Sequence, residues 1–186
     1  MEKISGKNVL VCGATGAVGY YAAKLLKQSG ANLFLCGRNE NRLNEIASEL
    51  NIPSDQLFVL ALEDEHSVNE MASKIHEKIQ AIDILINAAG IGIIKPIESL
   101  SSADFLTSLN ANLIGPFHLL KAFLPAMKET KKGLIINIPG VLGKTPMAGA
   151  AAYSASKYGL NGMLKSVREE LKRTDIRITN VFFGGI

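Results

Sequence analysis

Hydrophobic residues follow two alternating patterns along this chain. Short runs of consecutive apolar residues, such as the run at positions 9–12, alternate with longer segments in which apolar residues recur every three or four positions. The short runs are typical of strands buried on both faces of a sheet, and the periodic segments are typical of helices that cover such a sheet. The alternation continues over the whole chain. It predicts an α/β fold with a doubly wound parallel sheet, right-handed crossovers and helices on both faces.

The same pattern predicts the extent of each element. Strands are expected at 8–12, 32–36, 56–62, 83–86, 134–138 and 176–183. Helices are expected at 20–28, 42–50, 67–79 and 150–172, together with a long helix that Ser101 or Ser102 caps and that ends before Lys131. Pro116 is expected to kink that long helix, because proline lacks the N–H that an interior helical residue donates. Segment 139–149 is expected to be a loop.

Composition limits the class of protein. With 186 residues, of which 47% are hydrophobic and 20% charged, the chain is long enough for a core, and residues 1–186 are expected to form a single globular domain. The formal charge of +3 is small and the basic residues are scattered, so no nucleic-acid partner is expected. No apolar run reaches the ~18 residues of a membrane span. The first residues lack an apolar signal core, so a cytoplasmic protein without membrane contact is expected.

The cysteines and histidines do not indicate a metal site. Cys12 and Cys36 each end an apolar run, which predicts two buried free thiols without a disulfide. His66, His76 and His118 are dispersed and have no clustered Cys, His or Asp partner, so no metal ligand is expected among them.

A glycine-rich segment connects the first expected strand to the first expected helix. The segment Gly13-Ala-Thr-Gly16-Ala-Val-Gly19 follows directly on the strand. Glycines permit a tight turn and a close approach of the backbone to a ligand, while the start of the helix offers free N–H groups and the positive end of its dipole. This order predicts a binding site for the phosphates of a dinucleotide, and a glycine-rich turn without a ligand is the alternative. The candidate binding residues are Gly13, Thr15, Gly16, Ala17, Val18 and Gly19.

The residue that follows the second expected strand indicates which dinucleotide is bound. An acidic residue about 20 positions after the glycine motif would bind the ribose hydroxyls of NAD, but this region contains Gly37 and Arg38. An arginine guanidinium suits the 2′-phosphate of NADP instead. The sequence therefore favours NADP over NAD, with an ordinary surface arginine as the alternative.

Tyr153 and Lys157 form a candidate proton-transfer pair. They stand four residues apart in a segment that is expected to be helical, so both side chains lie on one face of the helix. An ammonium group close to a phenol favours the phenolate and lowers the phenol pKa. Such a pair can deliver or accept a proton near neutral pH. Taken alone, a tyrosine and a lysine at this spacing are more often a solvated helix edge.

Several motifs in a fixed order give the chain a family resemblance. They are Gly13-Ala-Thr-Gly16-Ala-Val-Gly19, Asn87-Ala-Ala-Gly90, Asn112-Leu-Ile-Gly115, Tyr153-Ser-Ala-Ser-Lys157 and the final Asn180-Val-Phe-Phe-Gly-Gly. From Lys7 to its last residue the chain resembles the short-chain dehydrogenase/reductases. The resemblance implies a Rossmann-type fold with strand order 3-2-1-4-5-6. It also implies an oxidoreductase that exchanges a hydride between NADP and a carbonyl or alcohol substrate.

The resemblance assigns roles to particular residues. Tyr153 would donate or accept the proton, Lys157 would hold the nicotinamide ribose and lower the pKa of Tyr153, and Asn112 would support a water chain that reaches Lys157. Asn87 would stabilise the centre of the sheet next to the cofactor. The further cofactor-binding positions are Leu62, Ala88, Ala89, Gly90 and Gly185.

The resemblance also implies an apolar substrate and a homodimer. Positions that face the substrate in the family are occupied here by Ile93, Ile94, Val141, Leu142, Met147 and Phe183. Lys95 and Lys144 leave an acidic substrate group as an alternative. The helices of Asn112 and Tyr153 pair with their symmetry mates in the family. Small residues in the second of these helices would permit close approach, unless they only pack on the sheet, and they are Ala151, Ala152, Ala155, Gly159 and Gly162.

The chain departs from the family pattern at the catalytic serine. That serine would stand thirteen residues before Tyr153, where this chain has Gly140. The missing hydroxyl would cost about 3 kcal/mol of transition-state stabilisation, and Thr145 in the same loop is a candidate replacement donor. Alanines also stand where the family usually has a glycine, an adenine-contacting aspartate and a second asparagine, namely at Ala17, Ala61 and Ala88.

The final residues depart from the pattern as well. Gly184-Gly185 stands where the family has Pro-Gly, and the substrate loop and seventh strand that follow in the family are not among these 186 residues. The expected domain therefore lacks them. Together with Gly140, this leaves a second function open, that of a catalytically weakened relative which binds NADP(H) as a sensor or interaction module.

Overall fold

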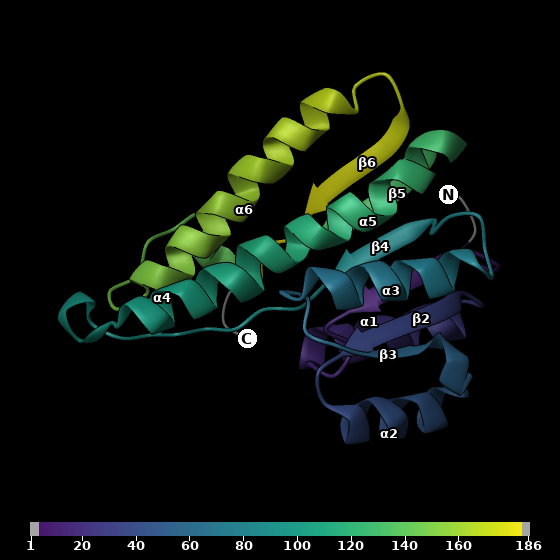
Figure 1. The fold of residues 1–186 in the computed structure, drawn as a ribbon, viewed down its shortest axis with the longest axis horizontal. Helices are drawn as coiled ribbons and strands as arrows, with labels where there is room; N and C mark the ends of the chain where they lie inside the picture. Colours follow the sequence, from purple (N-terminus) through teal and green to yellow (C-terminus); the bar gives the residue numbers. More distant parts are fainter. Residues whose placement is uncertain (1–3, 184–186) are drawn as a thin grey trace.

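Six parallel strands form one sheet at the centre of the molecule. In the computed structural model, which describes residues 4–183, the strand order is β3-β2-β1-β4-β5-β6 (Figure 1). The predicted doubly wound fold and its strand order are therefore confirmed. The order reverses between β1 and β4, which is where ligands bind in sheets of this kind. The strands are β1 (Asn8–Cys12), β2 (Asn32–Gly37), β3 (Leu57–Val59), β4 (Ile84–Asn87), β5 (Lys132–Asn137) and β6 (Asp175–Asn180).

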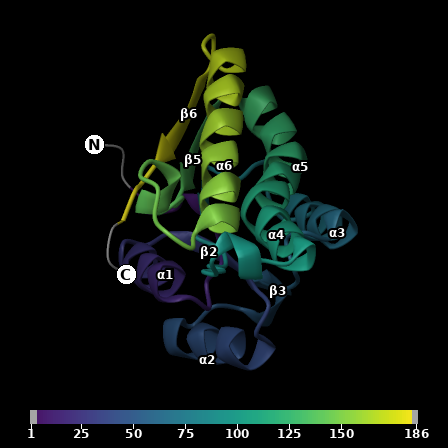
Figure 2. The same ribbon diagram turned by 90° about the vertical axis from the view of Figure 1, so that its left-hand side faces the viewer.

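Helices cover both faces of this sheet. α1 and α2 lie on one face, and α3, α5 and α6 lie on the other (Figure 2). Successive side chains of a strand point to opposite faces, so Val9 and Val11 pack toward α1 and α2, while Leu10 packs toward the other three helices. The helices are α1 (Ala17–Gln28), α2 (Glu40–Leu50), α3 (Glu65–His76), α4 (Ser102–Leu109), α5 (Gly115–Thr130) and α6 (Ala151–Glu170).

Two strands are shorter than predicted, because their partner strands end first. β3 was expected at 56–62 but pairs with β2 only over Leu57–Val59, where β2 reaches its last residue, Gly37. β6 was expected to continue to Phe183 but stops at Asn180, which pairs with the last residue of β5. Hydrophobic runs show where a strand can form, whereas its length depends on the neighbour that supplies the hydrogen bonds.

The long predicted helix is in fact two helices separated by a π-helical turn. Ser101 caps α4, and its side chain and that of Asp104 bond each other's backbone N–H groups. The π turn η3 (Asn110–Ile114) then connects α4 to α5. Pro116, which had been expected to kink this helix, lies in the first turn of α5 directly after the π turn, and the kink itself stays a prediction.

Three short 3-10 turns were not predicted. They are η1 (Ser54–Gln56), η2 (Ile97–Ser99) and η4 (Val141–Gly143), and η4 lies within the segment that was expected to be only a loop.

Over residues 4–183 the side chains of His, Cys, Asp and Glu form no cluster suited to a metal ion. Cys12 and Cys36 are free, buried thiols on paired strands, as predicted. Within the same residues, no helix has both the length and the apolar character needed to cross a membrane.

Candidate active site

The glycine-rich turn packs its backbone directly against the loop that follows β4. Gly13 follows β1 directly and has a φ of 78°, and a Cβ at this position would lie 2.6 Å from the backbone nitrogen of Ala89. A Cβ on Gly19 would lie 2.2 Å from the carbonyl oxygen of Gly13. Both positions therefore require glycine. The N-terminus of α1 has no side-chain cap, which leaves its N–H groups available to an anion.

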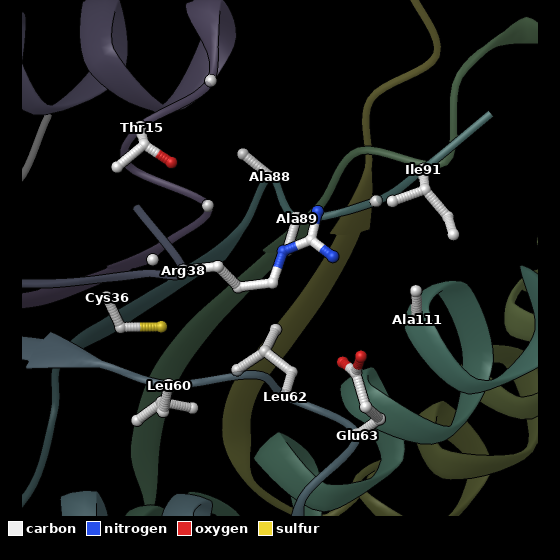
Figure 3. Close-up of a pocket in the computed structure, with 14 residues that line it drawn as sticks. Thr15, Cys36, Arg38, Leu60, Leu62, Glu63, Ala88, Ala89, Ile91 and Ala111 are labelled. Carbon is white, nitrogen blue, oxygen red and sulfur yellow. The ribbon is translucent and has the colours of Figure 1, made fainter. Parts of the chain in front are cut away.

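A cavity of about 200 Å³ opens at this turn (Figure 3). It lies at the carboxyl ends of β1, β2 and β4, where the strand order reverses. Of the cofactor-binding residues predicted from the sequence, the cavity is lined by Gly13, Thr15, Gly16, Arg38, Leu62, Ala88, Ala89 and Gly90. It is not lined by Ala17, Val18, Gly19, Asn87, Tyr153 or Lys157. Gly185 lies outside the described residues.

Six further lining residues were missed by the sequence analysis. They are Cys36, Gly37, Leu60, Glu63, Ile91 and Ala111. Most of them come directly from or after the carboxyl end of a predicted strand, so the rule that ligands bind at this edge of the sheet would have found them.

Arg38 extends its side chain into this cavity from the end of β2, and the Glu63 carboxylate is directed into the same space (Figure 3). Arg38 is exposed and makes no hydrogen bond or ion pair within the part of the chain that the structure describes. Its guanidinium donors are therefore free to bind an anion.

Tyr153 and Lys157 lie one turn apart on α6, as predicted. The Lys157 ammonium nitrogen is 5.5 Å from the centroid of the Tyr153 ring, and the lysine side chain is only 3% exposed. Burial lowers the pKa of Lys157 to about 8. Burial also raises the pKa of the half-buried Tyr153 hydroxyl, which is the opposite direction from the one expected. The lysine lies over the ring without bonding the hydroxyl, so desolvation dominates.

Asn112 joins this pair to the loop after β4. Its side chain lies in the π turn, is fully buried and bonds the backbone of Ile91 twice, because Nδ2 donates to the carbonyl at 2.9 Å and Oδ1 accepts from the N–H at 2.9 Å. Nδ2 also donates to the Ser156 hydroxyl at 3.0 Å, and that hydroxyl donates to the Tyr153 carbonyl at 2.7 Å. Ser156, which the sequence analysis missed, thus ties Asn112 to the helical turn of Tyr153.

Gly90 is the point where the cavity meets the catalytic candidates. A Cβ on Gly90 would lie 2.9 Å from both Asn112 Oδ1 and Lys157 Nζ. A side chain at position 90 would therefore displace one of these two polar groups, so Lys157 and Asn112 lie directly behind the wall of the cavity, and Tyr153 lies one helical turn from Lys157.

Gly140 is adjacent to the Tyr153 hydroxyl. A Cβ on Gly140 would lie 3.1 Å from the Tyr153 oxygen, so this position can present a side chain to the reacting group. Its backbone has φ 70° and ψ 165°, a conformation that only glycine adopts readily. Thr145, the candidate replacement donor, is exposed.

Asn87 lies at the centre of the sheet. It is 3% exposed, pairs with Cys12 on β1 and Asn137 on β5, and donates from Nδ2 to Asn137 Oδ1 at 3.3 Å. This location agrees with the supporting position expected for it.

The sequence profile of the short chain dehydrogenase family matches residues 7–186. The chain belongs to this family. An uncharacterized oxidoreductase of Staphylococcus epidermidis is 33% identical over 184 residues, which cover 99% of this chain and 80% of the relative. A chain of this family with relatives of this kind is an oxidoreductase of the short-chain dehydrogenase/reductase type.

Solved structures of the family have the same fold as this short-chain dehydrogenase. A metagenomic short-chain oxidoreductase in complex with NADP superposes with a TM-score of 0.91 at 32% identity, over 100% of this chain and 85% of that one. An NAD+-bound xylitol dehydrogenase superposes with a TM-score of 0.91 at 27% identity, over 98% of this chain and 72% of that one. The two neighbours bind different nicotinamide cofactors, so the fold alone does not distinguish NADP from NAD.

Proposed function

We propose that this short-chain dehydrogenase exchanges a hydride between NADP(H) and a small carbonyl or alcohol substrate. The proposal depends on one observation at Gly90, where the nucleotide cavity adjoins the candidate catalytic residues. On one side of Gly90 lies the glycine-lined cavity at the point where the strand order reverses. On the other side lie the buried Asn112 and Lys157, and Lys157 is one helical turn from Tyr153.

The residues around the cavity fit a dinucleotide phosphate. The backbone of Gly13 leaves no room for a side chain, and α1, whose N-terminus has no side-chain cap, begins directly after the lining residue Gly16. Arg38 has free donors where a 2′-phosphate would be recognised. We therefore favour NADP, which the metagenomic relative binds, over NAD.

The side chains around Gly90 supply the acid–base part of the reaction. When bound, the nicotinamide supplies or takes up the hydride. In the reducing direction the Tyr153 O–H bond breaks and its proton passes to the substrate oxygen, which becomes a hydroxyl. Lys157 would bind the ribose hydroxyls and stabilise the resulting phenolate by its positive charge. Asn112 would keep the loop after β4 in place beside the lysine.

An apolar substrate suits the mouth of this site better than an acidic one. Ile94, Val141 and Met147 are 52%, 40% and 48% exposed. Of the two lysines that left an acidic substrate group open, Lys95 is paired with Asp104 at 2.7 Å, a contact that lowers the pKa of Asp104 to about 2, and the Lys144 ammonium lies against the Phe182 ring. A substrate with an apolar body and one carbonyl group therefore matches the exposed side chains.

Cofactor titration and turnover test the proposal together. NADPH should bind at least several-fold more tightly than NADH, and Arg38→Ala should remove most of that difference. Turnover of aliphatic or aromatic ketones with NADPH should be lost in Tyr153→Phe, while NADPH affinity changes little because the ring still packs. Equal affinity for the two cofactors in the unmodified protein would contradict the choice of NADP. Tight NADPH binding without any turnover would favour the alternative of a binding module.

Three expectations from the sequence stay predictions. They are the single domain over residues 1–186, the cytoplasmic location and the homodimer, and a test of the homodimer is given in the Discussion.

A further inference from the structure

A second hollow lies on the other side of α6, away from the nucleotide cavity. It has a volume of about 450 Å³ and shares no lining residue with that cavity. α6 forms one wall, and β6 and the turn η4 form the others, so the hollow lies where α6 runs beside β6 (Figure 1). Its lining residues are Gly143, Lys144, Tyr158, Asn161, Lys165, Arg168, Asn180 and Phe182.

The charge of this hollow is all of one sign. Lys144, Lys165 and Arg168 line it, and no acidic residue does. Within residues 4–183, none of these three cations forms an ion pair, whereas nearby Lys172 and Lys128 pair with Glu169 and Glu170. Three uncompensated cations around one concave surface raise its positive potential and attract anions.

Two of the cations are held in position by contacts that leave their charge available. The Lys144 ammonium lies 3.9 Å from the centroid of the Phe182 ring, a cation–π contact, and the Tyr158 hydroxyl donates to the Lys144 carbonyl. Arg168 donates from Nε to the Ile178 carbonyl at 2.9 Å, which leaves its terminal nitrogens free for bidentate bonds to a phosphate.

Two side-chain amides also line the hollow and bond each other. Asn180 donates from Nδ2 to Asn161 Oδ1 at 3.0 Å, while its own Oδ1 is buried and has no partner among the described residues. Because that oxygen has almost no accessible surface, a ligand in the hollow would not reach it. Recognition of a ligand here therefore depends on an anionic group that the three cations bind.

We infer that this hollow binds the phosphate group of a small metabolite. The phosphate would lie between Lys144, Lys165 and Arg168. The site is separate from the nucleotide cavity, so the inference does not depend on the proposed function.

Titration with glycerol 3-phosphate tests the inference. The full chain carrying Arg38→Ala is used throughout at constant ionic strength, which removes the arginine of the nucleotide cavity, and the variants below distinguish binding in the hollow from binding at the glycine-rich turn. Saturable binding is expected by calorimetry, and glycerol alone should not bind because it lacks the phosphate that the cations recognise. Equal affinity for glycerol and glycerol 3-phosphate would overturn the inference.

Charge-removal variants locate the binding. Lys144→Gln and Lys165→Gln should each weaken binding of glycerol 3-phosphate by about tenfold, the loss expected for one charge-assisted hydrogen bond. Lys74→Gln is the matched control, since Lys74 is another lysine without an ion pair among the described residues and lies on α3. No saturable binding, or equal weakening by Lys74→Gln, would overturn the inference.

Discussion

Lys157 carries a cost in stability because its ammonium group is buried. The side chain is 3% exposed, and burial lowers its pKa from 10.5 to about 8. The unfolded chain therefore binds the proton more tightly than the folded chain does. Below about pH 8 the full cost is present, about 3 kcal/mol from this shift in pKa. As the pH rises from 8 toward 10.5, the cost disappears.

Replacement of this lysine should stabilise the protein in that pH window. Lys157→Met removes the buried charge at similar side-chain length, so the free energy of unfolding at pH 7 should rise by up to about 3 kcal/mol, while turnover is lost. At pH 10 the gain should be much smaller. Urea unfolding of both proteins at the two pH values measures the difference. A gain that is the same at both pH values would show that the charge is not its cause.

Gly140 is the residue at which the structure most changes the expected effect of a substitution. From the sequence alone, Gly140→Ser could raise turnover by up to ~10²-fold by restoring a donor. The structure supports the proximity, because a Cβ would lie 3.1 Å from the Tyr153 hydroxyl. However, φ of 70° and ψ of 165° are strained for any residue with a Cβ.

A comparison of two variants separates these effects. Gly140→Ala and Gly140→Ser introduce the same backbone strain, and both should lower the free energy of unfolding by about 1–3 kcal/mol. Only serine adds a hydroxyl, so the ratio of their turnover rates with NADPH and a ketone isolates the donor. We expect serine to exceed alanine by at least about tenfold. Equal rates would mean that a hydroxyl here does not reach the substrate.

At the scale of elements, the sequence predicted where each strand and helix forms but not how long it is or how the helices join. Apolar runs such as 9–12 depend only on local composition, and β1 formed as expected. β3 is shorter than predicted because β2, its partner strand, ends first, and the sequence of β3 does not contain that information.

The same limit applies to the cavity. The turn at Gly13 was visible as a motif, whereas Ala111 and Ile91 line the cavity only because separate elements meet there.

The π turn was invisible in the sequence because tertiary contacts hold it. Segment 102–130 has a continuous helical pattern, yet η3 interrupts it at Asn112, whose side chain satisfies both backbone groups of Ile91. π turns of this kind recur at functional sites. Here the turn directs Asn112 toward Gly90 and Lys157.

Removal of the Asn112 amide should therefore destabilise the protein. Asn112→Ala leaves the buried N–H and carbonyl of Ile91 without partners, which should lower the free energy of unfolding by about 2–4 kcal/mol. Asn110→Ala in the same turn is the control, because its side chain is exposed and it should change stability by less than about 0.5 kcal/mol. Urea unfolding measures both. Equal effects would mean that helix propensity, and not the Ile91 contacts, explains the loss.

At the scale of the whole molecule, one face carries exposed apolar side chains without a covering layer. Leu106, Ile114 and Phe117 follow the outer side of α4, η3 and α5 and are 56%, 37% and 44% exposed. On the neighbouring α6, Ala151 and Ala155 are also exposed and small. An apolar surface that extends over two packed helices is suited to pairing with a second copy across a two-fold axis.

Some of the small α6 residues that were expected in the dimer interface pack inside the monomer instead. Ala152 belongs to α6 and is fully buried. A Cβ on Gly159 would lie 3.1 Å from the Leu113 side chain, so both residues pack inside the monomer. Gly162 has open space around its Cα. The prediction of a homodimer therefore depends on Leu106 and Phe117 more than on the small residues of α6.

A charge placed on this face should separate the copies. Sedimentation equilibrium of the unmodified protein should show a dimer, and Phe117→Glu should raise the dissociation constant at least about 100-fold, because a carboxylate would be buried in an apolar contact. Leu25→Glu is the matched control, since Leu25 is 64% exposed on α1, which covers the opposite face of the sheet, and its substitution should leave the dimer unchanged. A monomer mass that is independent of concentration in the unmodified protein would contradict the prediction. Equal dissociation by both substitutions would place the contact elsewhere than on α4 and α5.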